Sequence, residues 1–364
     1  MRRLTLLLMA TVVLLLTNST FCLANDNPSK DDCYSIDIPY GFTITPKDDK
    51  WADLETREEM IEACSIPSEI YSKMTTEALL VTFLNHPLIL DYLAYTTPDE
   101  AYNMMIDSFS GFSELISRED IYDVLYQYYN APCTIQENNS PEAFFYQTTL
   151  EYFFVCCEYK QGINLSNNLS FIELLEKNNK KRLESGEYSE NTCLYLRVHP
   201  ETASLLSINI SYYDQPYGTV YTPNGTNVPV RSPYRSLTAS EKSYLNNKYA
   251  TAYPLATRIG APTASVNCHS FAWYQISYSN GYWMPNPIYY INDNSYVYFS
   301  GSPYYGIRVL YRDSSGYISH SAVCTGSYSA GAYVVDSKWG MTGTYEHMYS
   351  YGPYGSSVTL YKAN

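Results

Sequence analysis

The sequence is short of positive charge. Its 364 residues contain 23 Lys and Arg against 37 Asp and Glu, a net charge of −14. A protein that binds duplex nucleic acid needs concentrated Lys and Arg to neutralise phosphates, so this class of partner is excluded. Charged residues make up only 16% of the chain and hydrophobic residues 45%, and the chain has neither a collagen nor a heptad period. We therefore expect a folded globular protein rather than a disordered or fibrous one.

Long apolar runs are missing except at the N-terminus. Two arginines precede an apolar run from Leu4 to Leu16, which is too short to span a bilayer comfortably, and Ala24 completes a tolerable cleavage site. We expect residues 1–24 to be an export signal, the mature protein to be secreted or on the cell surface, and no transmembrane segment to follow. A lipid anchor on Cys22 is the alternative, although the bulky Phe21 precedes it.

Charge divides the rest of the chain in two. Residues 25–200 carry 12 Lys and Arg against 30 Asp and Glu, whereas residues 201–364 carry 9 against 7. Apolar residues in the first segment recur at helical spacing, and the second segment is mainly strands and turns. The sequence thus predicts an α+β protein with an all-helical acidic accessory domain at 25–200 and a second domain at 201–364. Of 41 tyrosines, 26 follow residue 200, which suits half-buried strands.

Several element boundaries are marked by capping and turn residues. Thr97–Glu100 combines an N-cap, a proline at the first helical position and a glutamate that closes a capping box, and Thr238–Glu241 forms a second box. Ser140 followed by Pro141 starts another helix, and Pro223–Thr226 is typical of a hairpin turn.

Cys268 stands at the start of a short helical pattern. Phe271, Tyr274 and Tyr278 continue that pattern, and Asn267 lies near the expected cap. A thiol at the positive end of a helix dipole is favoured as thiolate, the form that attacks a carbonyl carbon. Cys268 is therefore the candidate nucleophile.

His320 lies in the middle strand of a predicted antiparallel meander, formed by 306–312, 317–325 and 332–339. Ile318, His320, Ala322 and Cys324 share one face, which we expect to receive the helix that carries Cys268. A symmetric loop would set Ser337 opposite His320, and a one-residue shift would bring Asp336 or Lys338 there instead. Asp336 is the better partner chemically and Ser337 the better one by register, so the alternatives stay open.

The order of Cys268, His320 and a polar residue on the next strand resembles papain-like cysteine hydrolases, in particular secreted NlpC-type and CHAP-type cell-wall peptidases and amidases. The resemblance implies a papain-like domain at 201–364, an antiparallel sheet packed on a Cys-bearing helix, and a peptide or peptidoglycan-like substrate. Catalytic roles then fall to Cys268 and His320, with Asp336 or Ser337 as third residue. The strings 267–273 and 337–340 look more like uncharacterised secreted bacterial proteins, and the helical segment, with Trp51, resembles a helical module of such proteins that has no known activity.

Less specific interpretations compete with the catalytic one. Cys268 and Cys324 are also placed to form a disulfide, and Cys268, His269, His320 and Cys324 are zinc-ligand types, although they lack paired short spacing. Neither a cofactor nor a metal is expected. Trp273, Trp283 and Trp339 are candidates for a groove wall or for core, and His347 for a groove or a solvated loop. A non-catalytic binding or adhesion module with a tyrosine-rich surface is the alternative function.

Overall fold

The computed structural model describes residues 35–130, 140–161, 173–174, 177, 218–231, 236–327 and 332–364. The expected export signal at 1–24 and the expected boundary near residue 200 lie outside the described residues. Residues Ile36–Asn364 form one compact unit. We call the described residues of 36–161 the helical region and those of 218–364 the C-terminal region. Helices and antiparallel sheets together make the fold α+β, as the sequence predicts.

The helical region begins its helices at the residues that the capping signals mark. The Thr97 side chain accepts from the backbone N–H of Glu100 at the start of α5, and Thr56 and Glu59 form a similar box at α2. The elements are η1 (Asp49–Asp53), α2 (Arg57–Ala63), α3 (Ser68–Tyr71), α4 (Thr76–Leu84), η2 (Ile89–Ala94), α5 (Pro98–Ser108), α6 (Phe112–Leu115), α7 (Ile121–Asn130) and α8 (Pro141–Gln161).

The C-terminal region contains the predicted hairpin, the predicted capped helix and the predicted meander. The hairpin pairs β1 (Gly218–Tyr221) with β2 (Asn227–Val230), and Thr238 caps α12 (Ala239–Ala252). A seven-stranded antiparallel sheet has the order β3-β8-β7-β6-β5-β9-β4. Its strands are β3 (Thr257–Gly260), β4 (Tyr296–Tyr298), β5 (Arg308–Arg312), β6 (Ile318–Ser327), β7 (Tyr333–Lys338), β8 (Thr344–Met348) and β9 (Val358–Ala363), and the remaining helices are η5 (Ser270–Tyr274) and α13 (Ile288–Asn292).

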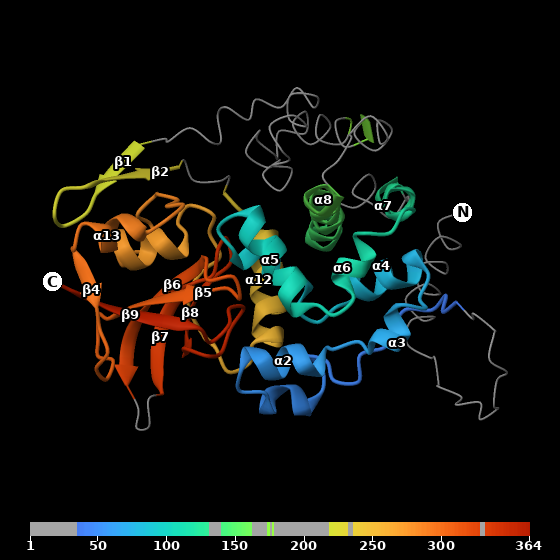
Figure 1. Ribbon diagram of the computed structural model, residues 1–364, viewed down its shortest axis with the longest axis horizontal. Helices are drawn as coiled ribbons and strands as arrows, with labels where there is room; N and C mark the ends of the chain where they lie inside the picture. Colours follow the sequence, from blue (N-terminus) through green and yellow to red (C-terminus); the bar gives the residue numbers. More distant parts are fainter. Residues whose placement is uncertain are drawn as a thin grey trace. The chain divides into compact units, whose positions relative to one another are not determined.

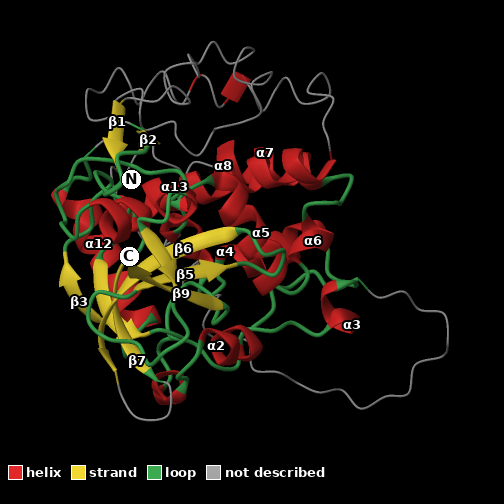
Figure 2. Cartoon of the chain, turned by 60° about the vertical axis from the view of Figure 1, so that its left-hand side comes forward, coloured by secondary structure: helices red, strands yellow, loops and turns green. Residues whose placement is uncertain are grey.

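The sheet carries a hydrophobic core on each face. On β5, Val309 and Tyr311 belong to a core shared with the helical region and α12, whereas Leu310 belongs to a second core with the hairpin, η5 and α13. This alternation follows from the two-residue period of a strand. Figures 1 and 2 show the sheet on one side and the helices α4, α6, α7 and α8 on the other, with α12 between them in Figure 1.

Polar contacts join the two regions through α12 and the residue that follows it. The Trp51 indole N–H donates to the carbonyl of Ala252 at 2.7 Å. Arg57 of α2 and Asp91 of η2 form a buried ion pair, and both contact the Tyr253 hydroxyl, at 2.8 and 2.6 Å. The helical region therefore packs on the C-terminal region through a specific buried network.

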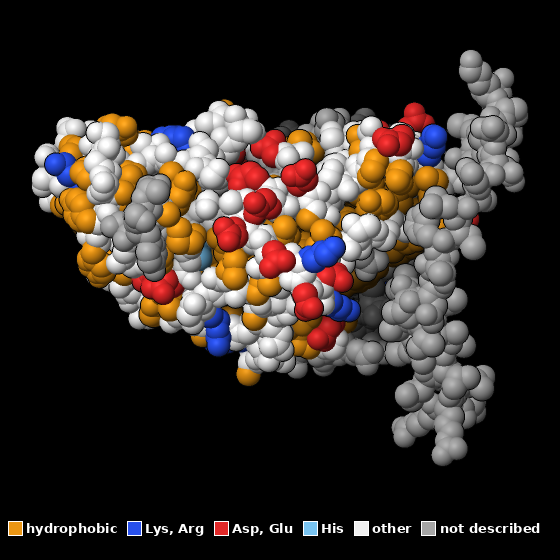
Figure 3. Space-filling model, turned by 90° about the horizontal axis from the view of Figure 1, so that it is seen from below, with side chains coloured by type: hydrophobic (Ala, Val, Ile, Leu, Met, Phe, Trp, Pro, Cys, Tyr) orange, Lys and Arg blue, Asp and Glu red, His pale blue; other side chains and the backbone are white. Residues whose placement is uncertain are grey.

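The surface of the helical region is acidic, as its composition predicts. Seen from below, Asp and Glu side chains gather over the middle of the molecule, and hydrophobic side chains, tyrosine included, gather over the sheet (Figure 3). None of the described helices combines the length and the apolar composition that crossing a membrane requires.

Candidate functional site

Cys268 begins the short helix that continues as η5. The helix ends at Tyr274, where Gln275 turns to an extended conformation, so it is shorter than the predicted run through Tyr278. Asn267 caps it as expected, because its side-chain oxygen accepts from the backbone N–H of Ser270 at 3.1 Å. The same oxygen accepts from the N–H of Met284 at 3.0 Å, which fixes the residue before the thiol.

His320 lies where strands β6 and β7 separate. Their pairing begins at Val323 and Asp336, so His320 on β6 and Ser337 on β7 extend beyond it. A shift between Cys324 and Gly326 moves the register away from the symmetric one, and His320 is not directly opposite Ser337. Their side chains still meet: His320 Nε2 and Ser337 Oγ are 2.5 Å apart. Of the polar residues considered for this contact, the structure places Ser337 on the ring.

The helix that carries Cys268 packs on the face of β6 opposite the predicted one. The ring of His269 and the indole N–H of Trp273 both contact Ser321 Oγ, each at 2.8 Å. Ala322 and Cys324 belong instead to the core shared with the helical region. The prediction was wrong because both faces of the sheet are covered, so apolar residues did not distinguish one face from the other.

His320 itself stacks on a residue that the sequence did not single out. The Tyr354 ring lies parallel to the imidazole, with 3.5 Å between ring centroids. Burial lowers the pKa of His320 well below its ordinary value, and the neighbouring His269, His347 and Lys338 lower it further. The imidazole is therefore neutral in this structure, and its Nδ1 has no hydrogen-bond partner in the part of the chain that the structure describes.

The Cys268 thiol is completely buried, contrary to the expectation of a helix-stabilised thiolate. Burial raises its pKa to about 12, although a contact with Thr96 and the backbone amides of Ser321 and His269 each act to lower it. The helix is only two turns long, and its favourable field is outweighed by the loss of solvent. Because His320 Nδ1 is unpaired and its Nε2 contacts Ser337, the two groups share no hydrogen bond here.

Thr96, from the helical region, covers the thiol. Its Oγ1 lies 3.5 Å from Cys268 Sγ and accepts from Asn267 Nδ2 at 3.3 Å, and its carbonyl accepts from the Trp283 indole at 3.3 Å. Thr96 precedes Cys268 by 172 residues, so no local sequence pattern links the two. The Thr97 capping box was the only available signal, because it fixes where α5 begins and therefore where Thr96 stands just before the helix.

Asp336 and Lys338 have surroundings different from those of Ser337. Asp336 is half-buried and lies opposite Glu346 of the neighbouring strand β8. Burial and the charge of the Glu346 carboxylate raise the pKa of Asp336 to about 6. Lys338 is buried, and its ammonium donates to the carbonyls of Gly340 at 2.5 Å and Thr342 at 2.6 Å. Burial lowers the pKa of Lys338 to about 7.

The structure bears on the disulfide, zinc and groove interpretations of these residues. Cys268 and Cys324 carry free thiols, so the disulfide between them is absent from the described structure. The described residues contain no group of three or more His, Cys, Asp or Glu that is suited to a metal. His347 is a buried residue of β8, neither a groove nor a loop residue, and its ring accepts from the Trp339 indole at 3.3 Å. The tryptophans considered for a groove wall, Trp273, Trp283 and Trp339, are all core residues.

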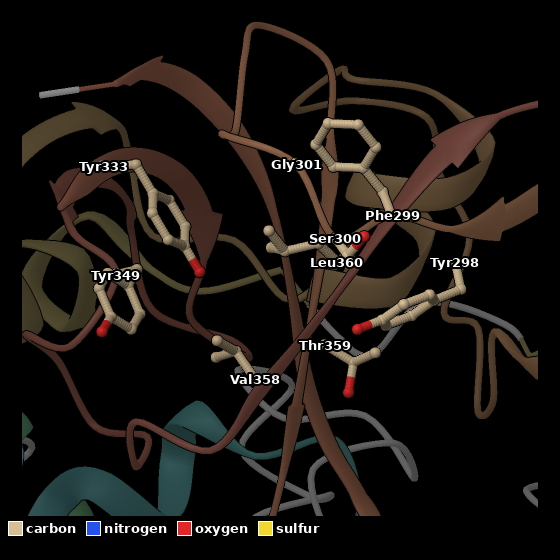
Figure 4. A pocket seen from close by; sticks show the side chains of 9 residues that line it. All are labelled: Tyr298, Phe299, Ser300, Gly301, Tyr333, Tyr349, Val358, Thr359 and Leu360. Carbon is tan, nitrogen blue, oxygen red and sulfur yellow. The ribbon is translucent and has the colours of Figure 1, made fainter. Parts of the chain in front are cut away.

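A separate aromatic pocket of about 350 Å³ opens beside strands β4 and β9. Tyr333 and Tyr349 stack at 4.3 Å between centroids, and Figure 4 shows them facing Tyr298 and Phe299 across the pocket. The Tyr333 hydroxyl is buried and has no hydrogen-bond partner among the described residues. None of the residues that line this pocket is charged: Tyr298, Phe299, Ser300, Gly301, Tyr333, Tyr349, Val358, Thr359 and Leu360.

Comparison with known proteins adds no relative. No protein-family model matches the chain, and neither the curated proteins nor the solved structures contain a significant match. Function must therefore be argued from the geometry of the site.

Proposed function

We propose that the chain is an exported cysteine hydrolase that cleaves an amide bond, with Cys268 as nucleophile and His320 as its base. The observation that carries the proposal is that both groups border the segment around Thr96. The Cys268 thiol and the Asn267 amide contact Thr96 directly. His320, held by Ser337, stacks on Tyr354, whose hydroxyl donates to the carbonyl of Ala94, two residues before Thr96. The peptide or peptidoglycan-like substrate class follows from the resemblance to papain-like hydrolases.

Each group has a defined step in such a reaction. When Nε2–H of His320 donates to Ser337 Oγ, Nδ1 keeps the lone pair that takes the proton from the Cys268 thiol. The thiolate then bonds to the amide carbon, and the Asn267 side-chain N–H and the Cys268 backbone N–H are the candidate donors to the oxyanion. The C–N bond breaks as His320 returns the proton to the leaving amine. Water, deprotonated by His320, attacks the thioester to release the carboxylic acid and restore the thiol.

The test is release of peptide or amine from purified peptidoglycan and from short N-acylated peptide amides, measured by mass spectrometry. We expect release to require Cys268 and His320, and to be lost in Cys268→Ala and His320→Ala. Cys324→Ala is the matched control, because Cys324 is a buried free thiol on the same strand as His320. Release that persists in Cys268→Ala contradicts the proposal.

The aromatic pocket favours a second candidate function, the binding of a neutral sugar. A sugar ring has an apolar face that packs on an aromatic ring and hydroxyls that hydrogen-bond, and this pocket offers tyrosine rings together with the hydroxyls of Ser300, Tyr333 and Thr359. Its lining has no charge to pair with an ionic ligand. In this alternative the chain is a binding module, and Cys268 and His320 are structural.

The second candidate is tested by saturation-transfer NMR with neutral oligosaccharides, for example cellohexaose and chitohexaose. Tyr298→Ala removes an exposed ring and leaves the core intact, so it is expected to weaken binding. Tyr317→Ala is the matched control, since Tyr317 is equally exposed but lies outside the pocket. Equal binding by the two variants contradicts a role for the pocket.

A further inference from the structure

The five residues Leu93–Thr97, which we call the closing segment, comprise the last two residues of η2 and the link from η2 to α5, and they lie over the Cys268 site. Within the segment, Leu93, Ala94 and Thr96 are buried. Thr96 contacts Cys268 Sγ through its side chain and the Trp283 indole through its carbonyl. A thiol that is wholly covered in this way is inaccessible to a peptide or a polymer.

The closing segment is held by residues that belong to the site. The Tyr354 hydroxyl donates to the Ala94 carbonyl at 2.5 Å while the Tyr354 ring stacks on His320. The backbone N–H of Met341 donates to the Leu93 carbonyl at 3.1 Å. Movement of the segment breaks the hydrogen bond from Tyr354 to Ala94 and therefore frees the Tyr354 ring, which stacks on His320 with 3.5 Å between the ring centroids.

The Thr96 hydroxyl occupies the position that a substrate oxygen needs. It lies between the Cys268 sulfur and the Asn267 side-chain N–H, at 3.5 and 3.3 Å. The carbonyl oxygen of a bound amide must lie within hydrogen-bonding reach of its donors while its carbon approaches the sulfur. The Thr96 hydroxyl and the carbonyl oxygen of a bound substrate cannot be present together, because both would occupy the same place.

We propose that the closing segment holds the Cys268 site in an inactive form, with the Thr96 hydroxyl in the place of the substrate carbonyl oxygen, and that the segment must be displaced before an amide binds. The consequence for turnover rests on the proposed hydrolase function. The shielding of the thiol does not, and it can be measured by itself.

Gly340 offers a way to displace the segment. It has a positive φ of +47°, and a Cβ there would lie 2.6 Å from the carbonyl carbon of Ala94 and closer still to the Leu93 oxygen. Gly340→Ala therefore pushes directly on the closing segment. Gly225→Ala is the matched control, because Gly225 also has a positive φ, +88°, but has no atom within 4 Å of the added Cβ. Tyr354→Phe is a milder variant that removes only the hydrogen bond to Ala94.

The measurement is the rate of iodoacetamide alkylation of Cys268 in the full chain, followed by peptide mass spectrometry. Cys64 and Cys324 are buried thiols in the same chain and report any general unfolding. We expect iodoacetamide to alkylate Cys268 at least about tenfold faster in Gly340→Ala than in the unchanged chain. The alkylation rate in Tyr354→Phe should lie between these two, and the rate in Gly225→Ala should equal that of the unchanged chain. Alkylation of Cys268 in the unchanged chain as fast as in guanidinium-unfolded protein overturns the proposal.

If Gly340→Ala fails to fold, Cys64 and Cys324 react together with Cys268, and Tyr354→Phe decides the matter. A Tyr354→Phe rate equal to that of the unchanged chain then counts against the closing segment. Turnover assays on the same samples separate the two proposals. Faster alkylation without Cys268-dependent release supports closure and contradicts the hydrolase. Cys268-dependent release from an unchanged chain whose thiol is already freely alkylated supports the hydrolase and contradicts closure.

Discussion

The buried network of Arg57, Asp91 and Tyr253 provides a direct test of how the two regions are joined. Arg57 comes from α2 and Asp91 from η2, whereas Tyr253 follows α12, and all three side chains are buried. In Arg57→Met, the carboxyl of Asp91 loses its buried cation and keeps the Tyr253 hydroxyl as donor. Removal of one partner of a buried pair leaves an uncompensated charge, and typically costs about 3–5 kcal/mol.

The pH dependence follows from the same geometry. Burial raises the pKa of Asp91, and the Arg57 guanidinium acts against this by lowering it. Without Arg57, the pKa of Asp91 rises further, so the folded state holds a proton that the unfolded state has released. Destabilisation by Arg57→Met is therefore expected to be smaller below pH 4, where Asp is protonated in both states, and to grow as the pH rises towards 7.

Chemical denaturation and calorimetry measure the loss. At about 2 °C per kcal/mol for a chain of this size, Arg57→Met is expected to lower Tm by roughly 6–10 °C. The double variant Arg57→Met with Asp91→Leu, which removes both charges, should recover much of that loss. Arg312→Met is the control, since this guanidinium donates to the Gly316 carbonyl on an exposed turn. A loss below about 1 kcal/mol for Arg57→Met, or separate unfolding of the two regions with only one affected, would refute the reasoning.

Three further predictions concern the ends of β6 and β7. Ser337→Ala leaves His320 Nε2 without its partner at 2.5 Å, so it should destabilise the chain by about 1–3 kcal/mol in urea unfolding and shift the His320 ring resonances in NMR; unchanged resonances would contradict the contact. Because the pKa of Asp336 is raised to about 6, this residue lowers the stability of the fold in a pH-dependent way: the loss is absent below pH 4, grows between pH 4 and 6 and is complete above 6. Asp336→Asn should therefore stabilise the half-exposed site by about 1 kcal/mol at pH 7 and by nothing at pH 3.5, after allowance for solvent screening. The lowered pKa of Lys338, about 7, makes its charged form costly below pH 7 and progressively less so up to pH 10. The stability of Lys338→Met relative to the unchanged chain should therefore be higher at pH 6 than at pH 9.5, and a pH-independent difference would count against it.

Local signals in the sequence were sufficient for most element boundaries. The capping boxes at Thr97 and Thr238 start α5 and α12 at the expected residues, and the Pro223–Thr226 turn closes the hairpin. These succeed because a cap or a tight turn is decided by a few neighbouring residues, whose hydrogen bonds satisfy the free backbone groups at a helix end.

The candidate site was harder to predict because it depends on contacts between distant segments. Alternation along β6 shows which residues share a face but not which core each face meets, so the face that receives the Cys268 helix was assigned wrongly. The Ser337 contact depends on a bulge at Cys324 and Gly326, and a bulge has no sequence signal here apart from a glycine. Thr96 lies in the other region of the chain and contributes to the site only through tertiary packing.

The causes that set the Cys268 pKa bear on how a closed thiol would act in the proposed hydrolase. Burial is the largest cause and raises the pKa, whereas the amides of Ser321 and His269 lower it. In the proposed opening, displacement of the closing segment admits water and removes much of the first effect. It also removes the Thr96 contact, a smaller cause that lowers the pKa, while the two amides, which belong to β6 and to the helix itself, stay in place. A full return of the pKa from about 12 to the ordinary value of 9 would multiply the thiolate fraction at neutral pH by about a thousand. In the proposed hydrolase, the movement that opens the site to substrate therefore also favours the thiolate form of the nucleophile.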